Sequence, residues 1–575
     1  MKRLETDILI LGSGGAGLFA ALHACRAAPN LKVTVAVKGL LGKCGCTRMV
    51  QGGYNVALAP GDSVERHFMD TIEGGAWLPN QELAWKLVTG AVERVRELEN
   101  ELGCFFDRNA DGTLHQKAFA GQSFDRTVHK GDLTGIEIIN RLAEAVWARG
   151  IHRLEEHRAL ELVPGKQGGR VAGALLIDVR TGEFVLVRAR AVVLATGGGP
   201  TMYKYHTPSG DKSCDGLAMA LRAGLALRDM EMVQFHPTGL LAGPHTRMTG
   251  TVLEEGLRGA GGHLLNGARE RFMVALDPRA ERATRDIVSR AMFAEIAAGR
   301  TTPHGGLYLS MRHVDPAEVR RQFKGMVERC ADCGFDLVAG QVEVVPTAHY
   351  MMGGVEFGLD CATEIPGLFA AGEDTGGVHG ANRLGGNGVA NSTVFGGVAG
   401  DEVAAWLATH GGAPEPDRAA IDRAITAALH PFEQPPGDLN AIREELHEVM
   451  WSNVGILRDG RGLRRGFAVL ASLGERLRRT GVADSTRRFN LTWQDWLNLD
   501  SLIDVSQAIA RAAYAREDSR GAHFRSDFPR ASDLAASAYS RLRFDGSGFA
   551  VEFAPVGFTR VRPGESLPTP KKAAA

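Results

Sequence analysis

Short apolar runs, glycine clusters and amphipathic stretches follow one another at the beginning of the chain. Residues 6–12 read "TDILILG", and residues 18–28 read "LFAALHACRAA", with apolar positions at helical spacing. We therefore predict a buried strand, a glycine-rich turn and a helix, followed by a second strand in residues 32–39, "KVTVAVKG". This order is typical of a βαβ unit in a parallel sheet.

The predicted turn carries three glycines at GxGxxG spacing, namely Gly12, Gly14 and Gly17. Glycine lets the backbone approach a pyrophosphate at the helix N-terminus, where unpaired N–H groups favour anions. The pattern therefore predicts a dinucleotide site. The second strand ends in Lys38, whereas an acidic residue there would bind the ribose of NAD. Lysine suits the extra phosphate of NADP or faces solvent, so an NAD(P)-dependent dehydrogenase stays open at this point.

Two later segments repeat the order of strand and glycine-rich loop. Residues 188–200 read "RARAVVLATGGGP", and residues 365–400 predict a strand, a glycine-rich loop and a helix. Three separated segments that return to one site favour a large flavin dinucleotide, FAD. The predicted fold class is α/β, with a Rossmann-like FAD-binding domain, an α+β capping domain and a C-terminal helical domain.

Changes in pattern along the chain set the domain boundaries. The FAD-binding domain is predicted in two parts, 1–240 and 350–412, with the capping domain at 241–349 between them. Amphipathic patterns after the proline-bearing linker "HGGAPEPD" predict a helical domain at 413–535. Residues 536–575 are predicted to be a C-terminal tail, which ends in a disordered segment, "GESLPTPKKAAA".

Composition excludes some partners. The formal net charge is -1, so the chain has no overall field that would attract nucleic acid or an anionic membrane. No apolar run approaches the roughly 20 residues that span a bilayer. We expect a cytoplasmic protein without a membrane segment of its own, and association with the inner membrane would require a partner subunit.

Eight cysteines in 575 residues follow no disulfide framework and are predicted to be reduced thiols. Cys44 and Cys46 lie two residues apart, but two thiolates cannot complete the four ligands of a structural zinc site. Cys330 and Cys333 form an isolated CxxC that we interpret as structural. We predict no metal site.

Several ordered motifs carry a family resemblance that covers nearly the whole chain. Beyond "GSGGAG" at 12–17, they are "QGG" at 51–53, "FHPTG" at 235–239, "RDIVSRA" at 285–291, "HYMMGGVE" at 349–356, "GANRLGGN" at 380–387 and "REDSRGAHFRSDFP" at 516–529. Together they resemble the succinate dehydrogenase and fumarate reductase flavoprotein subunit family, which also includes L-aspartate oxidase. The resemblance implies hydride transfer between flavin N5 and a C4 dicarboxylate such as fumarate or succinate.

The resemblance also implies roles for individual residues. Arg285 would handle the substrate proton, and Glu255 and Arg258 would relay it. His236, His349 and Arg383 would hold the substrate carboxylates, while Phe119 and Gln122 would form the pocket wall. The implied cofactor residues are Gly12, Gly14, Gly15, Ala16, Gly17, Lys38, Cys46, Thr47, Gln51, Gly52, Gly53, Ala195, Thr196, Gly197, Asp215, Glu373 and Asn387.

Several positions depart from the family pattern, among them Ala260, which replaces a glutamate, and the two that bear on the chemistry, Glu254 and Cys46. Glu254 stands where the family has a threonine that would bond a substrate carboxylate, and two like charges 4 Å apart cost about 4 kcal/mol at an effective dielectric of about 20. Either Glu254 is protonated, turns away or meets a different group, or the substrate is larger, less charged or amine-bearing. Cys46 occupies the position of the histidine that complex-forming members attach covalently to the flavin. We predict a dissociable FAD, with a cysteinyl thioether as the alternative.

Other functions stay open beside the fumarate and succinate prediction. An L-aspartate oxidase-like enzyme would keep the flavin and use another acceptor, and a non-catalytic electron-transfer subunit would leave the proposed catalytic residues without a role. The sequence has no cluster-binding cysteines of its own, so any iron–sulfur centre would belong to a partner subunit.

Overall fold

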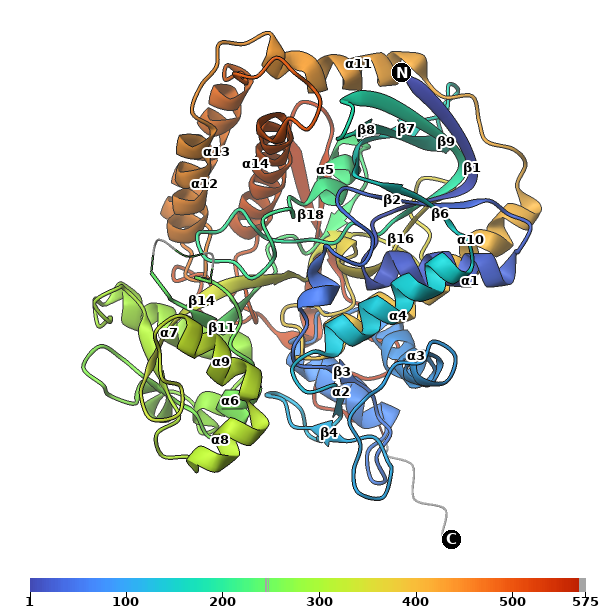
Figure 1. Ribbon diagram of the computed structural model, residues 1–575. Coiled ribbons are helices and arrows are strands. Elements are labelled where there is room, and N and C mark those ends of the chain that lie inside the picture. Colours follow the sequence, from blue (N-terminus) through green and yellow to red (C-terminus); the bar gives the residue numbers. More distant parts are fainter. Residues whose placement is uncertain (244–245, 247, 568–575) are drawn as a thin grey trace.

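The parallel strands of a mixed sheet carry the three glycine-rich segments (Figure 1). The computed structural model describes residues 1–243, 246 and 248–567, and within these residues the largest sheet has seven strands in the order β6-β2-β1-β9-β8-β7, with β16 beside β9. The strands are β1 (Lys2–Leu11), β2 (Val33–Val37), β6 (His152–Glu155), β7 (His157–Pro164), β8 (Val171–Asp178), β9 (Glu183–Leu194) and β16 (Leu368–Ala370).

The register of this sheet brings the glycine-rich loops to one edge. Strands β1, β9 and β16 are parallel, and Leu11 and Ala370 both pair with Leu194. Because these residues end their strands, the loops that begin at Gly12, Ala195 and Ala371 leave the sheet side by side. A ligand bound outside the carboxyl ends of parallel strands would contact all three loops.

One face of the sheet is covered by helices that share a hydrophobic core with it. Helices α1 and α10 approach closely, because a Cβ on Gly396 would lie 2.5 Å from the carbonyl oxygen of Ala16, and one on Gly400 would lie 2.4 Å from that of Ala20. The glycines therefore permit a contact that larger residues would prevent. The helices on this side are α1 (Gly15–Ala27), α3 (Gln81–Asn100), α4 (Thr134–Ala148) and α10 (Asn387–Thr409), with α2 (Val64–Gly74) beside α3.

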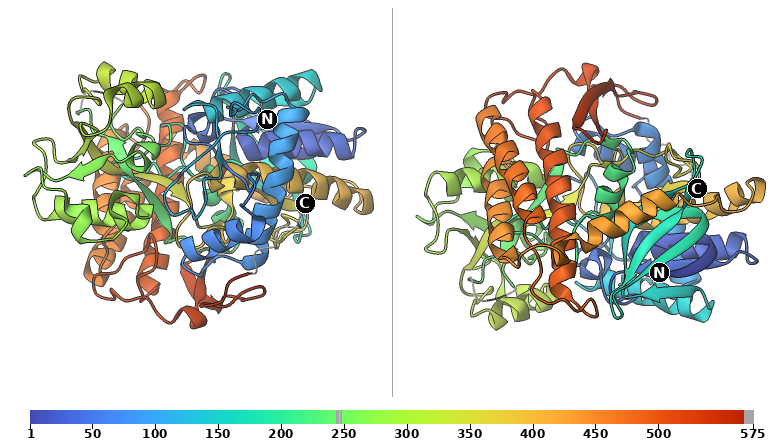
Figure 2. Two further views of the ribbon diagram at one scale, coloured as in Figure 1. Left: turned by 90° about the horizontal axis from the view of Figure 1, so that it is seen from below. Right: turned by 90° about the horizontal axis from the view of Figure 1, so that it is seen from above.

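The C-terminal helices lie on the opposite face, where α12, α13 and α14 run side by side (Figure 2). Their buried residues belong to the same hydrophobic cluster as those of β7, β8 and β9. The predicted helical domain therefore shares its core with the FAD-binding domain. Its helices are α11 (Arg418–Leu429), α12 (Leu439–Asn453), α13 (Gly460–Arg478) and α14 (Leu491–Ala515), and α5 (Asp215–Arg222) packs against α14.

The cap has its own core and a sheet of order β11-β14-β13-β12 (Figure 1). The chain enters through β11 and leaves through β14, which pair antiparallel. Strand β11 precedes the predicted boundary at 241 and β14 runs past 349, so the cap sheet extends into the flanking segments. The elements are β11 (Val233–Leu240), β12 (His263–Leu265), β13 (Leu307–Ser310), β14 (Val342–Met351), α6 (Gly256–Gly259), α7 (Arg285–Ala297), α8 (Pro316–Gln322) and α9 (Lys324–Asp332).

The prediction of a C-terminal tail from residue 536 is wrong for its first part. Strands β17 (Ala538–Phe544) and β18 (Phe549–Pro555) form a hairpin, and β17 pairs with β10 (Leu227–Arg228), which also pairs with β15 (Gly354–Val355). Only Ser540 and Leu542 of β17 are buried, so the sequence carries a weak apolar signal there. Of the segment predicted to be disordered, residues 568–575 lie outside the described residues.

A small sheet of β3 (Tyr54–Asn55), β5 (Thr127–Val128) and β4 (Gln116–Lys117) faces the cap from the first domain (Figure 1). It is positioned near the cap residues that line the site described below. Among the described residues, no helix is long and apolar enough to cross a membrane.

Candidate active site

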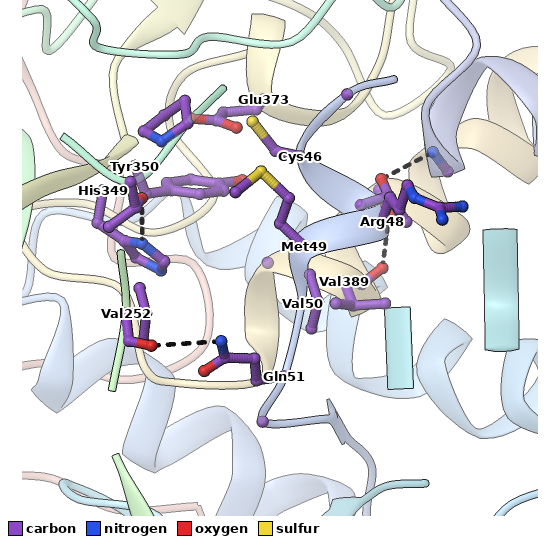
Figure 3. A pocket seen from close by; sticks show the side chains of 18 of the residues that line it. Cys46, Arg48, Met49, Val50, Gln51, Val252, His349, Tyr350, Glu373 and Val389 are labelled. Atoms are coloured by element: carbon purple, nitrogen blue, oxygen red, sulfur yellow. Dashed lines mark hydrogen bonds between the residues drawn. The ribbon is translucent and has the colours of Figure 1, made fainter. Parts of the chain in front are cut away.

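A cavity of about 400 Å³ lies between the carboxyl edge of the large sheet, the beginning of α1 and the cap (Figure 3). Its lining joins cofactor residues predicted from the first domain to substrate residues predicted from the cap. The predicted residues that line it are Gly14, Gly15, Ala16, Cys46, Thr47, Gln51, Gly52, Gly53, Phe119, Ala195, Thr196, Gly197, His236, Glu254, Glu255, Arg285, His349, Glu373 and Arg383.

A smaller cavity of about 60 Å³ continues from the first along the sheet edge. The two share lining residues, including Gly14, Thr196 and Lys212, and the smaller one is lined by Gly12, Lys38 and Asp215. The predicted cofactor residues therefore lie along one elongated site, as an extended dinucleotide requires.

The beginning of α1 suits a pyrophosphate. The backbone N–H of its first residue, Gly15, donates to Thr47 Oγ1 at 2.9 Å, and a Cβ on Gly12 would lie 2.1 Å from the carbonyl oxygen of Ala195. Within the described residues, the buried polar atoms Ser13 Oγ and Gln51 Oε1 have no hydrogen-bond partner. The backbone thus comes close to the ligand site, and two polar atoms beside it are left for a ligand.

Lys38 is fully engaged by protein acceptors. Its ammonium lies 3.0 Å from Ser213 Oγ, 2.9 Å from Asp215 Oδ2 and 3.0 Å from Asn498 Oδ1. An ammonium has three N–H donors, and these three contacts use them all. Asp215 also accepts from Arg158 at 2.6 Å. Lys38 therefore has no donor left for the extra phosphate of NADP, which removes the basis of that alternative.

At the substrate end, a carboxylate joins two arginines. Glu255 Oε2 accepts from Arg285 Nη2 at 2.6 Å and Nε at 3.2 Å, and Glu255 Oε1 accepts from Arg258 Nη2 at 2.8 Å. Arg285 Nη1 donates to Gln234 Oε1 at 3.0 Å. Burial alone would raise the pKa of Glu255, but the two guanidinium groups outweigh it and lower that pKa to about 2. Glu255 is thus ionised at neutral pH.

Two histidines face the same cavity in their neutral form. The backbone N–H of Thr238 donates to His236 Nδ1 at 3.3 Å, so the proton of neutral His236 is on Nε2. His349 Nδ1 lies 2.8 Å from the hydroxyl of Thr207. Burial, reinforced by Arg285, lowers the pKa of both imidazoles well below the usual range. His236 can therefore donate a neutral hydrogen bond.

Arg383 is a buried cation whose donors are only partly used. Its guanidinium stacks 4.4 Å from the ring centre of Tyr350, and its Nη1 donates to the carbonyl of Leu384 at 3.3 Å. Its buried Nε has no partner among the described residues. Burial, helped by the charge of Arg285, lowers the pKa of Arg383 to about 10, so it remains a cation at neutral pH. This arrangement is ready to bind an anion.

Glu254 meets a cation that the sequence did not point to. Its Oε1 accepts from Lys117 Nζ, and its carboxylate is 3% exposed in the cavity wall. Burial raises the pKa of Glu254, and Lys117 opposes that rise. Phe119, two residues beyond Lys117, lines the cavity as predicted.

Four predicted site residues lie behind the wall of the cavity. Gln122 donates to the carbonyl of Gly385 at 3.0 Å, Arg258 lies behind Glu255, and Asn387 bonds Asn55, His67 and Thr71. A Cβ on Gly17 would lie 2.0 Å from the carbonyl oxygen of Gly12, so Gly17 allows close packing of the turn. The side-chain N–H of Gln122 supports the loop at Gly385, and its buried Oε1 has no partner among the described residues, so its place in the pocket wall stays a prediction. The four predicted site residues that do not line the cavity are therefore Gly17, Gln122, Arg258 and Asn387.

Comparisons with known proteins agree with this arrangement. A family model described as an FAD binding domain matches residues 7–389, and one described as the fumarate reductase flavoprotein C-terminus matches residues 443–571. The chain belongs to the succinate dehydrogenase and fumarate reductase flavoprotein family. It is an FAD-dependent oxidoreductase of this type.

Individual relatives match over most of their length. One subunit of the fumarate reductase (CoM/CoB) of Methanothermobacter marburgensis is 40% identical over 534 residues, which cover 91% of this chain and 95% of that protein. The fumarate reductase flavoprotein subunit of Escherichia coli is 35% identical over 547 residues, covering 92% and 89%. A solved structure of a variant of the Escherichia coli quinol fumarate reductase flavoprotein has a TM-score of 0.92 at 33% identity, covering 98% and 99%.

Within this family site, several lining residues were missed from the sequence. Tyr350 follows the predicted His349 directly, so the same motif could have indicated it. Lys212 lies near Cys46 with its Nζ 3.3 Å from the carbonyl oxygen of Thr196, in a segment without a recognisable motif. Other lining residues that were missed are Thr207, Val252 and Arg329.

Cysteines around the flavin site are unpaired thiols. All eight cysteines are free. Cys46 begins the short 3-10 helix η1 (Cys46–Met49) and lies beside Glu373, while Gln51 donates to the carbonyl of Val252 at 3.3 Å (Figure 3). Burial, followed by the charge of Glu373, raises the pKa of the Cys46 thiol to about 12. The thiol is therefore protonated at neutral pH.

The CxxC of the cap ends helix α9. Cys330 is buried in the cap core, Cys333 is half-buried, and burial raises the pKa of both thiols. In the described part of the chain, no group of three or more His, Cys, Asp or Glu side chains could hold a metal ion. The pair contributes to packing of the cap.

Proposed function

We propose that this protein interconverts fumarate and succinate, or a close C4 dicarboxylate pair. The observation that carries the proposal is the chain of contacts from Arg285 through Glu255 to Arg258, which begins at the cavity that Arg383, His236 and His349 also line. The names of the relatives as fumarate reductases support it.

FAD, when bound along the elongated site, supplies the hydride acceptor and donor. Arg383 binds a carboxylate of the substrate with donors that no protein group uses, and the Nε2 proton of His236 adds a hydrogen bond. These contacts orient the central carbons of the substrate towards the cofactor site.

Arg285 gives a proton to the substrate carbon, or takes one from it. Its guanidinium has five N–H donors, and its contacts with Glu255 and Gln234 use three of them. The remaining two can face the substrate in the cavity. After it has given up its proton, Arg285 would regain one through the relay: Glu255 would pass to Arg285 a proton that it takes from Arg258, and Arg258 would be reprotonated from solvent. In the direction of succinate oxidation, the proton would move the opposite way.

An anaerobic assay tests the proposal. Purified holoenzyme with reduced viologen should oxidise the viologen when fumarate is added, and succinate should bleach the oxidised flavin. Hydrogen peroxide released from L-aspartate, without either of these reactions, would instead support the oxidase alternative.

Replacing Arg383 by glutamine should raise the KM for fumarate by about a hundredfold or more. The loss of a charge-assisted hydrogen bond to a buried carboxylate costs about 2–5 kcal/mol. Steady-state kinetics with reduced viologen measures the effect, and an unchanged flavin absorbance shows that the cofactor site is intact. Arg383→Lys should recover only part of the affinity, because lysine cannot form two parallel hydrogen bonds. A KM that stays within threefold of the wild type contradicts this role.

We also propose that FAD binds without a covalent bond. The protonated thiol of Cys46 is a poor nucleophile, because the thiolate is the reactive form. After denaturation in acid and filtration, all yellow colour should pass into the filtrate for the wild type and for Cys46→Ser alike. Colour that stays with the wild-type protein and is released from Cys46→Ser would show a thioether bond.

Electrons would reach or leave the flavin through a separate partner. The relatives are named as subunits, which supports an iron–sulfur partner subunit for this chain and a peripheral place at a membrane through that partner. Purification from the native source under mild conditions, followed by iron analysis of the co-purifying subunits, tests this proposal.

A further inference from the structure

Glu254 places a carboxylate in the wall of the substrate cavity, next to Glu255 in the chain. Glu255 is balanced by two arginines, whereas the contact of Glu254 is with Lys117. The backbone N–H of Glu254 meets Met326 Sδ at 3.5 Å, which helps to fix the segment. The carboxylate therefore stays beside the substrate.

Lys117 approaches Glu254 from outside the cavity. It lies on β4, where it pairs with Thr127 of β5, and it is not among the residues that line the cavity. Its Nζ lies 3.4 Å from the carbonyl of Gly131 and 5.8 Å from the ring centre of Phe119. Strand β4 and these contacts hold the ammonium against the carboxylate from outside the lining of the cavity.

The charges of the substrate end match a dianion only when Glu254 is neutralised. The three buried arginines and the carboxylate of Glu255 leave two net positive charges, and a C4 dicarboxylate carries two negative ones. Asp132 and Arg329, which also line the cavity, carry opposite charges and leave this sum unchanged. An unpaired Glu254 would remove one of these positive charges and repel the nearer substrate carboxylate. The three buried arginines in this count are Arg258, Arg285 and Arg383.

We propose that Lys117 is a positioning residue that determines which substrate charge the cavity accepts. It neutralises Glu254 and so lets the cavity bind a dicarboxylate dianion. This inference rests on the proposed function. It explains how a substrate carboxylate can bind near the carboxylate of Glu254 without repulsion. A less charged or amine-bearing substrate is then not required.

The pair also connects the cap with the first domain, since Glu254 belongs to the cap and Lys117 to β4. A purely mechanical link would affect every substrate equally. Neutralisation of charge would instead affect a dianion far more than a monoanion of the same shape. Fumarate and fumarate monoamide are such a pair of probes.

Kinetics of the holoenzyme with both probes test the inference. Lys117→Met should raise the KM for fumarate at least tenfold, since an unpaired like charge a few ångströms away costs more than this factor at an effective dielectric of about 20. The KM for the monoamide should change less than threefold, and kcat should stay within threefold for both probes. Lys117→Arg should restore the KM for fumarate to near its wild-type value.

The double variant Lys117→Met/Glu254→Gln separates charge from mechanical linkage. It lacks the ion pair but also lacks the unpaired carboxylate, so the KM for fumarate should return to within threefold of the wild type. Lys130→Met is the matched control, because Lys130 is half exposed and pairs with Asp107 outside the cavity. It should leave both KM values unchanged.

Two outcomes overturn the inference. One is an equal rise in KM for both probes in Lys117→Met, and the other is a double variant that stays as impaired as Lys117→Met. Binding of the probes, measured as a change in the flavin spectrum, distinguishes a failure of the inference about Lys117 from a failure of the proposed function. A wild type that binds fumarate without turnover contradicts the proposed function alone, and the same variants are then compared by Kd. A wild type that binds neither probe contradicts both.

Discussion

Replacing Arg285 by alanine is expected to lower kcat for fumarate by at least about a thousandfold, while the protein still binds FAD. General acid catalysis contributes up to about 10⁴ to a rate, and Arg285 lines the cavity with N–H donors that the protein does not use. Its side chain also compensates Glu255, so alanine would leave that carboxylate with Arg258 alone. Arg285→Lys keeps the charge but not the planar group, and we expect a loss of similar size.

The measurement is anaerobic turnover of fumarate with reduced viologen, together with the ratio of flavin to protein. Arg300→Ala is a suitable control, because Arg300 lies just beyond the end of the same helix, α7, and its exposed guanidinium pairs with Glu295 and does not line the cavity. It should keep wild-type turnover. An Arg285→Ala variant that retains a tenth of the wild-type kcat, with flavin bound, would show that another group transfers the proton.

The sequence predicted the parts of this site that depend on local pattern. Glycine spacing indicated the turn after β1, and the two later glycine-rich segments lie beside it because β1, β9 and β16 are parallel and in register. The family resemblance also implied that Glu255 and Arg258 act together, and they are in contact because residues three apart lie on one face of a helical turn. In each case the relevant partners are close in the chain or fixed by the sheet.

Partners distant in the chain could not be found in this way. Lys117 and Glu254 are 137 residues apart and belong to different domains, and Lys38 and Asp215 are 177 residues apart. From the sequence, Lys38 and Asp215 were expected to contact the cofactor, Glu254 was expected to conflict with a substrate carboxylate, and nothing pointed to Lys117. The structure shows that each charge is balanced by another side chain, which changes the chemistry expected at both places.

Packing also places Phe119 and Gln122 differently. The family resemblance implied that both form the pocket wall, and Phe119 lines the cavity, whereas Gln122 lies behind the lining and donates to the carbonyl of Gly385. The hairpin of β17 and β18 was missed for a related reason. Its stability depends on pairing with β10, more than 300 residues earlier, and not on a strong apolar pattern of its own.

Replacing Glu255 by glutamine should both slow turnover and destabilise the protein. The carboxylate accepts hydrogen bonds from Arg285 and Arg258, whereas the amide of glutamine would turn an N–H donor towards one of these guanidinium groups. The step that restores the proton on Arg285 would also be lost. We expect kcat for fumarate to fall by about a hundredfold or more.

The loss of stability should depend on pH in a defined direction. The pKa of Glu255 is about 2 in the folded protein and 4.5 without its surroundings, a difference that corresponds to about 3 kcal/mol of stability. Because the folded pKa is the lower one, this contribution is complete above about pH 4.5 and is lost as the pH falls towards 2. Glu255→Gln lacks it at every pH.

Thermal unfolding of the holoenzymes at pH 7 and at pH 3 therefore distinguishes electrostatic stabilisation from simple packing. The difference in Tm between wild type and Glu255→Gln should be several degrees at pH 7 and clearly smaller at pH 3. Glu318→Gln is the matched control in the cap, because Glu318 is exposed on α8 and contacts only Gln322 among the described residues. It should unfold like the wild type at both pH values. A difference in Tm that is the same at pH 7 and pH 3 would mean that Glu255 stabilises the cap through its shape, and its place in the proton relay would then rest on the loss of turnover alone.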